Sequence, residues 1–300
     1  MREELFKNCT LCPRKCNVNR LEGKRGYCGM DSTIRAARAA LHMWEEPCIS
    51  GKKGSGAVFF SGCGLRCCFC QNRDIAIGDS GKEISVERLA EIFLELQEKG
   101  AANLNLVTGA HYVPHIILAL ELARGKGMNL PVVYNSSGYE SVETIRRLDG
   151  YVDVYLPDMK YMEPELAAAF SNARDYPQAA QSAIAEMMRQ TGPCQFAEDG
   201  YIKRGTIVRH LILPGHTQNS IAVLKYLYRT YGEDIFISVM NQYTPVWKNE
   251  KFPELNRKVT RREYEKVLDA AIELGIENGY FQEGETAEES FIPAFDYEGV

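Results

Sequence analysis

Residues 60–72 read Phe-Ser-Gly-Cys-Gly-Leu-Arg-Cys-Cys-Phe-Cys-Gln-Asn, and Cys63, Cys67 and Cys70 form a C-x3-C-x2-C pattern within them. Three thiols so close together cannot all be structural disulfide partners, but they can bind one face of a metal cluster. Closely spaced Cys thiolates are the usual ligands of iron–sulfur clusters. Three protein ligands leave one iron of a four-iron cluster open. A zinc knuckle or a chance grouping of cysteines is the alternative.

The composition indicates one large domain, or one domain with an appendage. The chain has 300 residues, of which 45% are hydrophobic, enough for a sizeable core. The net charge is −5 and there is no block of basic residues, so we expect no nucleic-acid partner. Residues 1–7 are charged, unlike a signal peptide, and no apolar stretch is long enough to span a membrane. We therefore expect a cytoplasmic protein without membrane partners.

Ten cysteines in such a chain favour metal binding over disulfide formation. Cys9, Cys12, Cys16 and Cys28 have the spacing C-x2-C-x3-C-x11-C, and four thiolates suffice for a closed zinc site or an auxiliary iron–sulfur cluster. The spacing does not decide between the two, and we favour the cluster because the chain already requires cluster assembly. The remaining cysteines are interpreted as small buried hydrophobic residues: Cys48, Cys68 and Cys194. A radical relay is the alternative for Cys48.

From residue 57 onward, short apolar runs alternate with stretches of helical periodicity. We expect strands over 57–60, 104–107, 131–134, 152–156, 206–213 and 235–239. We expect helices over 86–96, 114–123, 141–148, 177–188, 220–228 and 260–275. The expected N-caps are Ser85, Ser141 and Thr260. Six strand–helix units predict a parallel sheet with right-handed crossovers, too few to close an eight-stranded barrel. Ligands of such folds bind at the carboxyl ends of the strands, where the cysteine motif lies.

The cysteine pattern, with Phe69 before its last cysteine, resembles the radical S-adenosylmethionine (SAM) superfamily. The resemblance implies an α/β fold: a partial (β/α)6 TIM-like barrel with an irregular N-terminal Cys-rich extension. It also implies a [4Fe-4S] cluster on the three cysteines, with SAM bound to the open iron and reductively cleaved to methionine and a 5′-deoxyadenosyl radical. We expect residues 1–56 to form the metal-binding extension, 57–280 the core barrel and 281–300 a C-terminal tail.

Four further segments narrow the resemblance to homologues of pyruvate formate-lyase activating enzymes that carry an N-terminal Cys-rich extension. These segments are Cys70-Gln-Asn72, Glu46-Pro-Cys-Ile-Ser-Gly51, Tyr151-Val-Asp-Val-Tyr-Leu-Pro-Asp158 and 203–215. The chain departs from the pattern twice. Gly64 replaces the Asn that usually follows the first cluster cysteine, and Gly109-Ala110 replaces a Pro-Thr pair. Neither change removes a cluster ligand, but both alter the loop expected over SAM.

The same resemblance assigns SAM-binding roles to residues in the cysteine loop and at the strand ends. In the Asp158-x-Lys160 motif, Lys160 would pair with the SAM carboxylate, and Arg209 would reach its carboxylate or ribose. A structural ion pair at the barrel rim is the alternative for Asp158 and Lys160. For His111, an ordinary turn residue is as good an interpretation as a ligand. The full set of expected cofactor-binding residues is Phe69, Thr108, Gly109, Asn135, Ser136, Asp158, Lys160, Arg209, Leu211 and Gln242.

By resemblance, the substrate is a protein that receives a glycyl radical, and reduced flavodoxin or ferredoxin delivers the electron. One alternative is a radical SAM enzyme that modifies a small molecule or another protein side chain. An alternative of another class is an electron-transfer iron–sulfur protein without SAM chemistry. That protein needs a fourth cluster ligand, and Cys68 is the only nearby candidate. The sequence specifies neither substrate nor oligomeric state, and we expect substrate contacts from loops and from residues 284–300.

Overall fold

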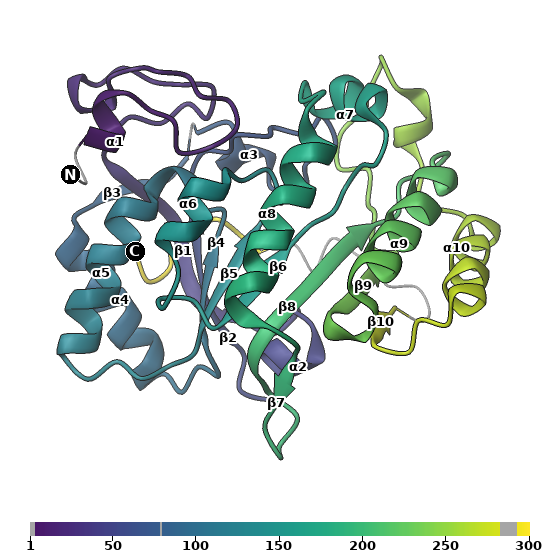
Figure 1. Ribbon diagram of the computed structural model, residues 1–300. Helices are drawn as coiled ribbons and strands as arrows, with labels where there is room; N and C mark the ends of the chain where they lie inside the picture. The colour runs from purple at the N-terminus through teal and green to yellow at the C-terminus, as the bar shows by residue number, and fades with distance from the viewer. Residues whose placement is uncertain (1–3, 79, 283–292) are drawn as a thin grey trace.

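The computed structural model describes residues 4–78, 80–282 and 293–300, so the expected substrate contacts of residues 284–292 lie outside the described residues. The protein is an α/β structure in which a curved, mostly parallel sheet carries helices on its outer face (Figure 1). Within the described ranges, no helix is both long enough and apolar enough to span a membrane.

Six parallel strands form the centre of the sheet, as the sequence predicts. These strands are β2 (Ser55–Phe60), β4 (Leu104–Val107), β5 (Val132–Ser136), β6 (Val154–Pro157), β8 (Ile202–Leu211) and β9 (Phe236–Met240). The strand order is β10-β9-β8-β6-β5-β4-β2-β1-β3, with a short β7 (Gln195–Phe196) paired to β8. The sheet therefore has the order of a partial barrel.

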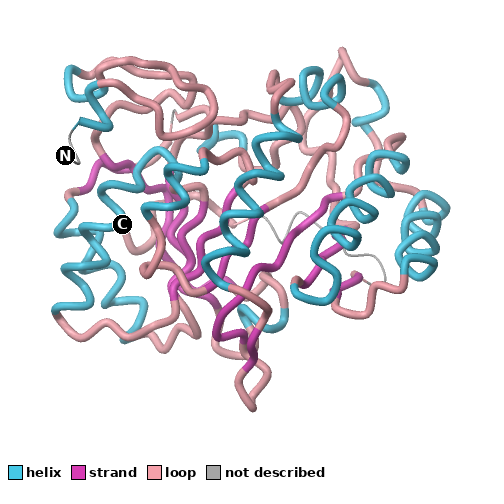
Figure 2. The backbone as a smooth tube through the Cα atoms, in the orientation of Figure 1, coloured by secondary structure: helices cyan, strands magenta, loops and turns pink. Residues whose placement is uncertain are grey.

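Helices cross between these strands on the outside of the sheet (Figure 2). They are α4 (Val86–Glu98), α5 (Val113–Gly125), α6 (Val142–Arg147), α7 (Pro164–Ser171), α8 (Tyr176–Thr191), α9 (Thr217–Tyr231) and α10 (Arg261–Leu274). Ser85, Ser141 and Thr260 cap α4, α6 and α10 through their side chains, and Thr260 forms a capping box with Glu263. These caps confirm the predicted helix starts, whereas α7 was not predicted.

Four strands were not predicted, and the short β7 is one of them. β1 (Ile34–His42) pairs antiparallel with both β2 and β3 (Lys82–Ile84), and β10 (Gly279–Phe281) adds a further parallel strand beside β9. The expectation of irregular backbone throughout residues 1–56 is therefore wrong for β1. The strand forms because its small residues, such as Ala36 and Ala39, pack in the core near α4, while Arg38 reaches the carboxylates of Asp296 and Glu298.

Short elements complete the chain. The α-helical ones are α1 (Glu4–Lys7), α2 (Pro47–Ser50) and α3 (Arg73–Ala76), and the 3-10 turns are Arg20–Glu22, Ala110–Tyr112, Gly232–Asp234 and Pro253–Asn256. α2 lies between β1 and β2 in the sequence and near the amino ends of the barrel strands in space (Figure 1). Its Cys48 and Ile49 are buried against Val133, Val154 and Ile207 of the barrel strands. α2 thus fills the base of the barrel and forms a floor beneath the strand ends.

Candidate active site

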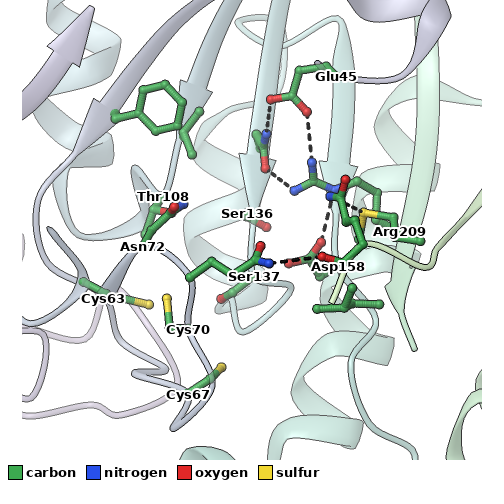
Figure 3. A pocket seen from close by; sticks show the side chains of 18 of the residues that line it. Glu45, Cys63, Cys67, Cys70, Asn72, Thr108, Ser136, Ser137, Asp158 and Arg209 are labelled. Carbon is green, nitrogen blue, oxygen red and sulfur yellow. Dashed lines mark hydrogen bonds and ion pairs between the residues drawn. The ribbon is translucent and has the colours of Figure 1, made fainter. Parts of the chain in front are cut away.

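A pocket of about 320 Å³ opens inside the barrel above this floor. The loop after β2 and the carboxyl ends of β4, β5, β6, β8 and β9 all contribute to its wall, as the positions of Cys63, Thr108, Ser136, Asp158 and Met240 show. Figure 3 shows the three cysteines on one side of the pocket and a group of charged side chains on the other. The pocket therefore lies where ligands bind in parallel α/β folds.

The cysteine loop is anchored by apolar packing. Leu65 is completely buried, and the ring of Phe69 makes edge contacts with Tyr161, Phe170 and Tyr243. The backbone N–H of Cys68 donates to the carbonyl of Phe170, and the Cys68 side chain does not line the pocket. With the loop held in this way, the three cysteines of the C-x3-C-x2-C pattern line the pocket while their neighbour does not.

The donor set of this loop suits an iron–sulfur cluster. Three thiols line one wall, and thiolates are the ligands that such clusters require. Burial raises the pKa of Cys70 to about 12 and also raises the pKa of Cys67, although Lys160 opposes the shift at Cys67. No three His, Cys, Asp or Glu side chains in the described part of the chain are placed to hold a single metal ion. The thiols fit a cluster because thiolates are its usual ligands.

Arg209 is the centre of the charged group opposite the cysteines. Its Nε donates to Asp158 at 3.1 Å, its Nη1 to Glu45 at 3.0 Å and its Nη2 to Asn135 at 2.6 Å. Asp158 also receives a hydrogen bond from Lys160 Nζ at 2.6 Å. Figure 3 shows these contacts converging on the guanidinium group. The network joins β5, β6 and β8 to the segment that precedes α2.

Charge pairing overcomes burial within this network. Burial alone would raise the pKa of Asp158, but Lys160 and Arg209 outweigh it and hold that pKa below its usual value. Burial would lower the pKa of Lys160, and Asp158 reverses that effect, so the pKa is raised. The pKa of Arg209 is likewise raised, because Asp158, Glu45 and Glu46 outweigh its burial. All three groups are therefore charged near neutral pH.

The structure brings most of the predicted cofactor residues into this pocket. The lining includes Phe69, Thr108, Asn135, Ser136, Asp158, Lys160, Arg209, Leu211 and Gln242. Gly109 does not line the pocket, and a Cβ atom at this position would lie 2.6 Å from a side-chain atom of Ile116 on α5. Thr108 has a φ of 61°, in the left-handed region that a β-branched residue rarely adopts. Such strain gathers at ligand sites and fits a position in this wall.

Several lining residues were missed by the sequence prediction. The end of β1 and the segment that leads from it to α2 contribute His42, Trp44, Glu45 and Glu46, and strand β10 contributes Tyr280. β10 and this segment are far from the cysteine motif in the sequence, so the expected strand ends did not indicate them. A signal was nevertheless present, because the segment 46–51 is part of the subgroup resemblance.

The remaining candidates from the sequence lie outside the pocket. His111 is buried, its Nε2 lies 2.7 Å from the carbonyl oxygen of Ser61, and burial lowers its pKa to about 3. Cys48 lies in the floor, where burial raises its pKa to about 12. Cys194 accompanies Cys48 at the barrel base. These positions fit structural roles.

The N-terminal cysteines lie beside the cluster loop. Cys12 interacts electrostatically with Cys9 and Cys28, and Cys28 interacts with Cys16. Arg14 links this segment to the loop, because its Nε donates to the carbonyl of Gly64 at 2.9 Å. Figure 1 shows the N-terminal turns at the carboxyl ends of the strands. The four thiols thus share one region, and their metal-binding role stays a prediction.

The chain matches the Radical SAM superfamily model over residues 57–227. Among curated proteins, it is 30% identical over 276 residues to the uncharacterized protein MJ0674 of Methanocaldococcus jannaschii, an alignment covering 90% of this chain and 75% of that protein. It is 27% identical over 113 residues to the pyruvate formate-lyase-activating enzyme of Clostridium pasteurianum, which covers 36% of this chain and 46% of that enzyme.

Among solved structures, SuiB of Streptococcus suis bound to the precursor peptide SuiA is similar with a TM-score of 0.47 and 13% identity. That match covers 74% of this chain, which spans about half (46%) of the length of SuiB. The family model alone covers more than half of this chain, including all three motif cysteines and the strands β2 to β8. The protein therefore belongs to the radical SAM superfamily.

Proposed function

We propose that this protein reductively cleaves SAM and uses the 5′-deoxyadenosyl radical to remove a hydrogen atom from a glycine of a partner protein. The observation that carries the proposal is the convergence of Cys63, Cys67 and Cys70 with Asp158 and Lys160 on one pocket. The three cysteines suit a cluster, and Asp158 and Lys160 reproduce the Asp-x-Lys motif of activating enzymes. The partial match to a pyruvate formate-lyase-activating enzyme supports the choice of substrate.

When bound, a [4Fe-4S] cluster supplies an open iron for SAM and one electron, obtained from reduced flavodoxin or ferredoxin. That electron would allow SAM to be cleaved to methionine and a 5′-deoxyadenosyl radical, which would take a hydrogen atom from the substrate and leave as 5′-deoxyadenosine. In this proposal, Cys63, Cys67 and Cys70 hold the cluster, and the Lys160 ammonium orients the SAM carboxylate. The buried ring of Phe69 helps to exclude water from the reacting atoms.

The test is anaerobic reconstitution with iron and sulfide, followed by reduction, addition of SAM and measurement of 5′-deoxyadenosine. The wild-type protein should form the product, and Cys63→Ala should not. Cys68→Ala is the matched control, because Cys68 lies in the same loop without lining the pocket. Equal product from wild type and Cys63→Ala would contradict the assignment of Cys63 as a cluster ligand. No product from a wild-type protein with an intact reduced cluster would contradict SAM cleavage.

The choice of substrate has a separate test. A purified glycyl-radical enzyme incubated with the reconstituted protein, SAM and reductant should acquire a glycyl radical, detected by electron paramagnetic resonance. Formation of 5′-deoxyadenosine without that signal would keep the radical SAM reaction and reject the glycyl-radical partner. A small molecule or another protein side chain is then the substrate, a second candidate favoured by the polar floor of the pocket at Glu45 and Glu46.

A further inference from the structure

Glu46 has a carboxyl oxygen that the network around Arg209 does not use. The residue lines the pocket and is only 8% exposed, and its Oε2 has no hydrogen-bond partner in the described structure. A buried polar atom without a partner is costly, so few occur in folded proteins without a reason. Glu46 lines the same cavity as the cysteines, and a ligand that enters the cavity can supply the missing donor.

The other charged groups of the pocket indicate whether that ligand carries positive or negative charge. Arg209 already donates to Asp158, Glu45 and Asn135, and Lys160 donates to Asp158. Both cations are therefore paired. Among the residues that the structure describes, the lining holds two cationic side chains, Lys160 and Arg209, and three carboxyl groups, Glu45, Glu46 and Asp158. The oxygen without a partner belongs to Glu46, one of the three carboxyl groups, so a positively charged donor suits it best.

The titration behaviour of neighbouring groups agrees with this balance. Burial raises the pKa of Glu46, Arg209 opposes the shift and Glu45 adds to it. His42, also in the pocket, has a pKa lowered to about 4 by burial and by Arg209 and Arg38, so it adds no positive charge near neutral pH. A cation placed beside Glu46 would oppose the effect of burial on its pKa and favour the ionised form of its carboxyl group.

We propose that Glu46 forms, with Glu45 beside it, an anionic subsite that binds a positively charged nitrogen of the substrate, an ammonium or a guanidinium group. The inference rests on the proposed function, since it takes the pocket to be the site where a radical meets its substrate. Glu46 lines the pocket directly after Glu45, which Figure 3 shows at the end of the pocket away from the cysteines. Aromatic side chains of Trp44 and Phe59 in the same lining suit a cationic guest.

The test uses small probes of one size and different charge. The reconstituted protein, with its cluster oxidised so that no SAM is cleaved, is titrated with n-butylammonium, n-butylguanidinium, butyrate and n-butanol, and binding is followed by ligand-detected NMR. The two cations should bind at least tenfold more tightly than butyrate or n-butanol. Glu46→Gln should weaken the binding of the cations at least tenfold, whereas Glu98→Gln, on the exposed end of α4, should not change it. Equal binding of all four probes, no binding of the cations, or unchanged binding in Glu46→Gln would overturn the proposal.

Further titrations distinguish which molecule supplies the positively charged group. SAM itself carries positive charge, so the titration is repeated with saturating SAM; competition between SAM and n-butylammonium would assign the subsite to SAM and overturn the proposal. A capped tripeptide with a central lysine is the next probe. If it binds more tightly than n-butylammonium, the natural ligand is a protein side chain, and if it binds equally or more weakly, the natural ligand is a free amine.

If Glu46→Gln does not fold, Glu46→Asp, which keeps the charge, should retain the preference for cations. The same samples, once reduced, are assayed for 5′-deoxyadenosine, so a failure of SAM cleavage is seen separately from a failure of cation binding.

Discussion

A Cβ atom built on Gly64 would lie 3.3 Å from the Sγ atom of Cys12. This relationship joins the N-terminal cysteine segment to the residue that directly follows the first cluster cysteine. A distance of this kind is shorter than most van der Waals contacts, so a larger side chain at position 64 would push against Cys12. The packing of Cys12 on the loop therefore favours a residue without a side chain at position 64.

Replacing Gly64 with Asn should therefore destabilise this contact. We expect Gly64→Asn to lower the free energy of unfolding by about 1–3 kcal/mol, the usual cost of overpacking, measured by denaturant titration under anaerobic conditions. Gly125→Asn is the matched control, since a Cβ atom at the end of α5 would meet nothing within 4 Å. Equal unfolding curves for wild type and Gly64→Asn would show that Cys12 does not restrict the loop.

The N-terminal cysteines should add metal to the protein. If Cys9, Cys12, Cys16 and Cys28 hold a second four-iron cluster, anaerobically reconstituted protein should contain about eight irons per chain, and Cys12→Ser about four. The backbone N–H of Tyr27 already donates to the Cys16 sulfur at 3.3 Å, as suits a thiolate ligand. Cys194→Ser, at the barrel base, should leave the iron content unchanged.

The measurement is elemental analysis of iron and zinc on the same samples. The wild-type protein could instead contain one zinc per chain and iron for only one cluster, with the zinc lost in Cys12→Ser. That result would show that the four cysteines bind zinc and not a second cluster. Metal for a single cluster in the wild-type protein, with no zinc, would contradict both alternatives.

Lys160 should act on SAM rather than on the fold. Its ammonium is paired with Asp158, but Asp158 also accepts from Arg209, so removal of the lysine leaves this carboxylate with a cationic partner. We expect Lys160→Met to weaken SAM binding at least about tenfold, because the SAM carboxylate loses its counter-charge in a buried pocket. The change is measured from the SAM-induced perturbation of the cluster spectrum.

The exposed Lys126 provides the control for that experiment, and Lys126→Met should bind SAM like the wild type. Unchanged SAM affinity in Lys160→Met, together with a lowered melting temperature, would show that the Asp158–Lys160 contact is only a structural ion pair.

The sequence predicted what depends on local pattern. The six strand–helix units follow from alternating periodicities, and the caps of Ser85, Ser141 and Thr260 follow from residue type and position. The cysteine motif was enough to predict the family, because the three cluster ligands lie in one short loop. Each of these features is encoded within a short stretch of chain.

The missed features depend on contacts between distant segments. β1 is rich in Ala, which strands do not favour, and pairing with β2 and β3 on its two edges stabilises it. Glu45 belongs to the pocket because Arg209, on a strand 164 positions later, binds its carboxylate. No periodicity in residues 42–46 indicates such a partner, so the polar floor of the pocket became visible only in the structure.

Glu140 should make stability depend on pH. The side chain is buried and accepts a hydrogen bond from the Tyr134 hydroxyl at 3.3 Å, and burial raises its pKa to about 8 although Tyr134 and Ser136 oppose the shift. Between the usual carboxyl pKa of about 4.5 and about 8, the folded state holds a proton that the unfolded state has released. Its contribution to stability is therefore full below about pH 4.5 and is lost as pH rises towards 8.

Glu140→Gln removes this titration, because the amide carries no charge at any of these pH values. The free energy of unfolding of the wild type should fall, relative to that of Glu140→Gln, by an amount on the order of a few kcal/mol between pH 5 and about pH 8. Denaturant unfolding at a series of pH values measures the difference. Glu143→Gln, an exposed change three residues away in α6, should follow the wild-type pH profile. Parallel profiles for wild type and Glu140→Gln would mean that Glu140 is ionised in the folded protein despite its burial.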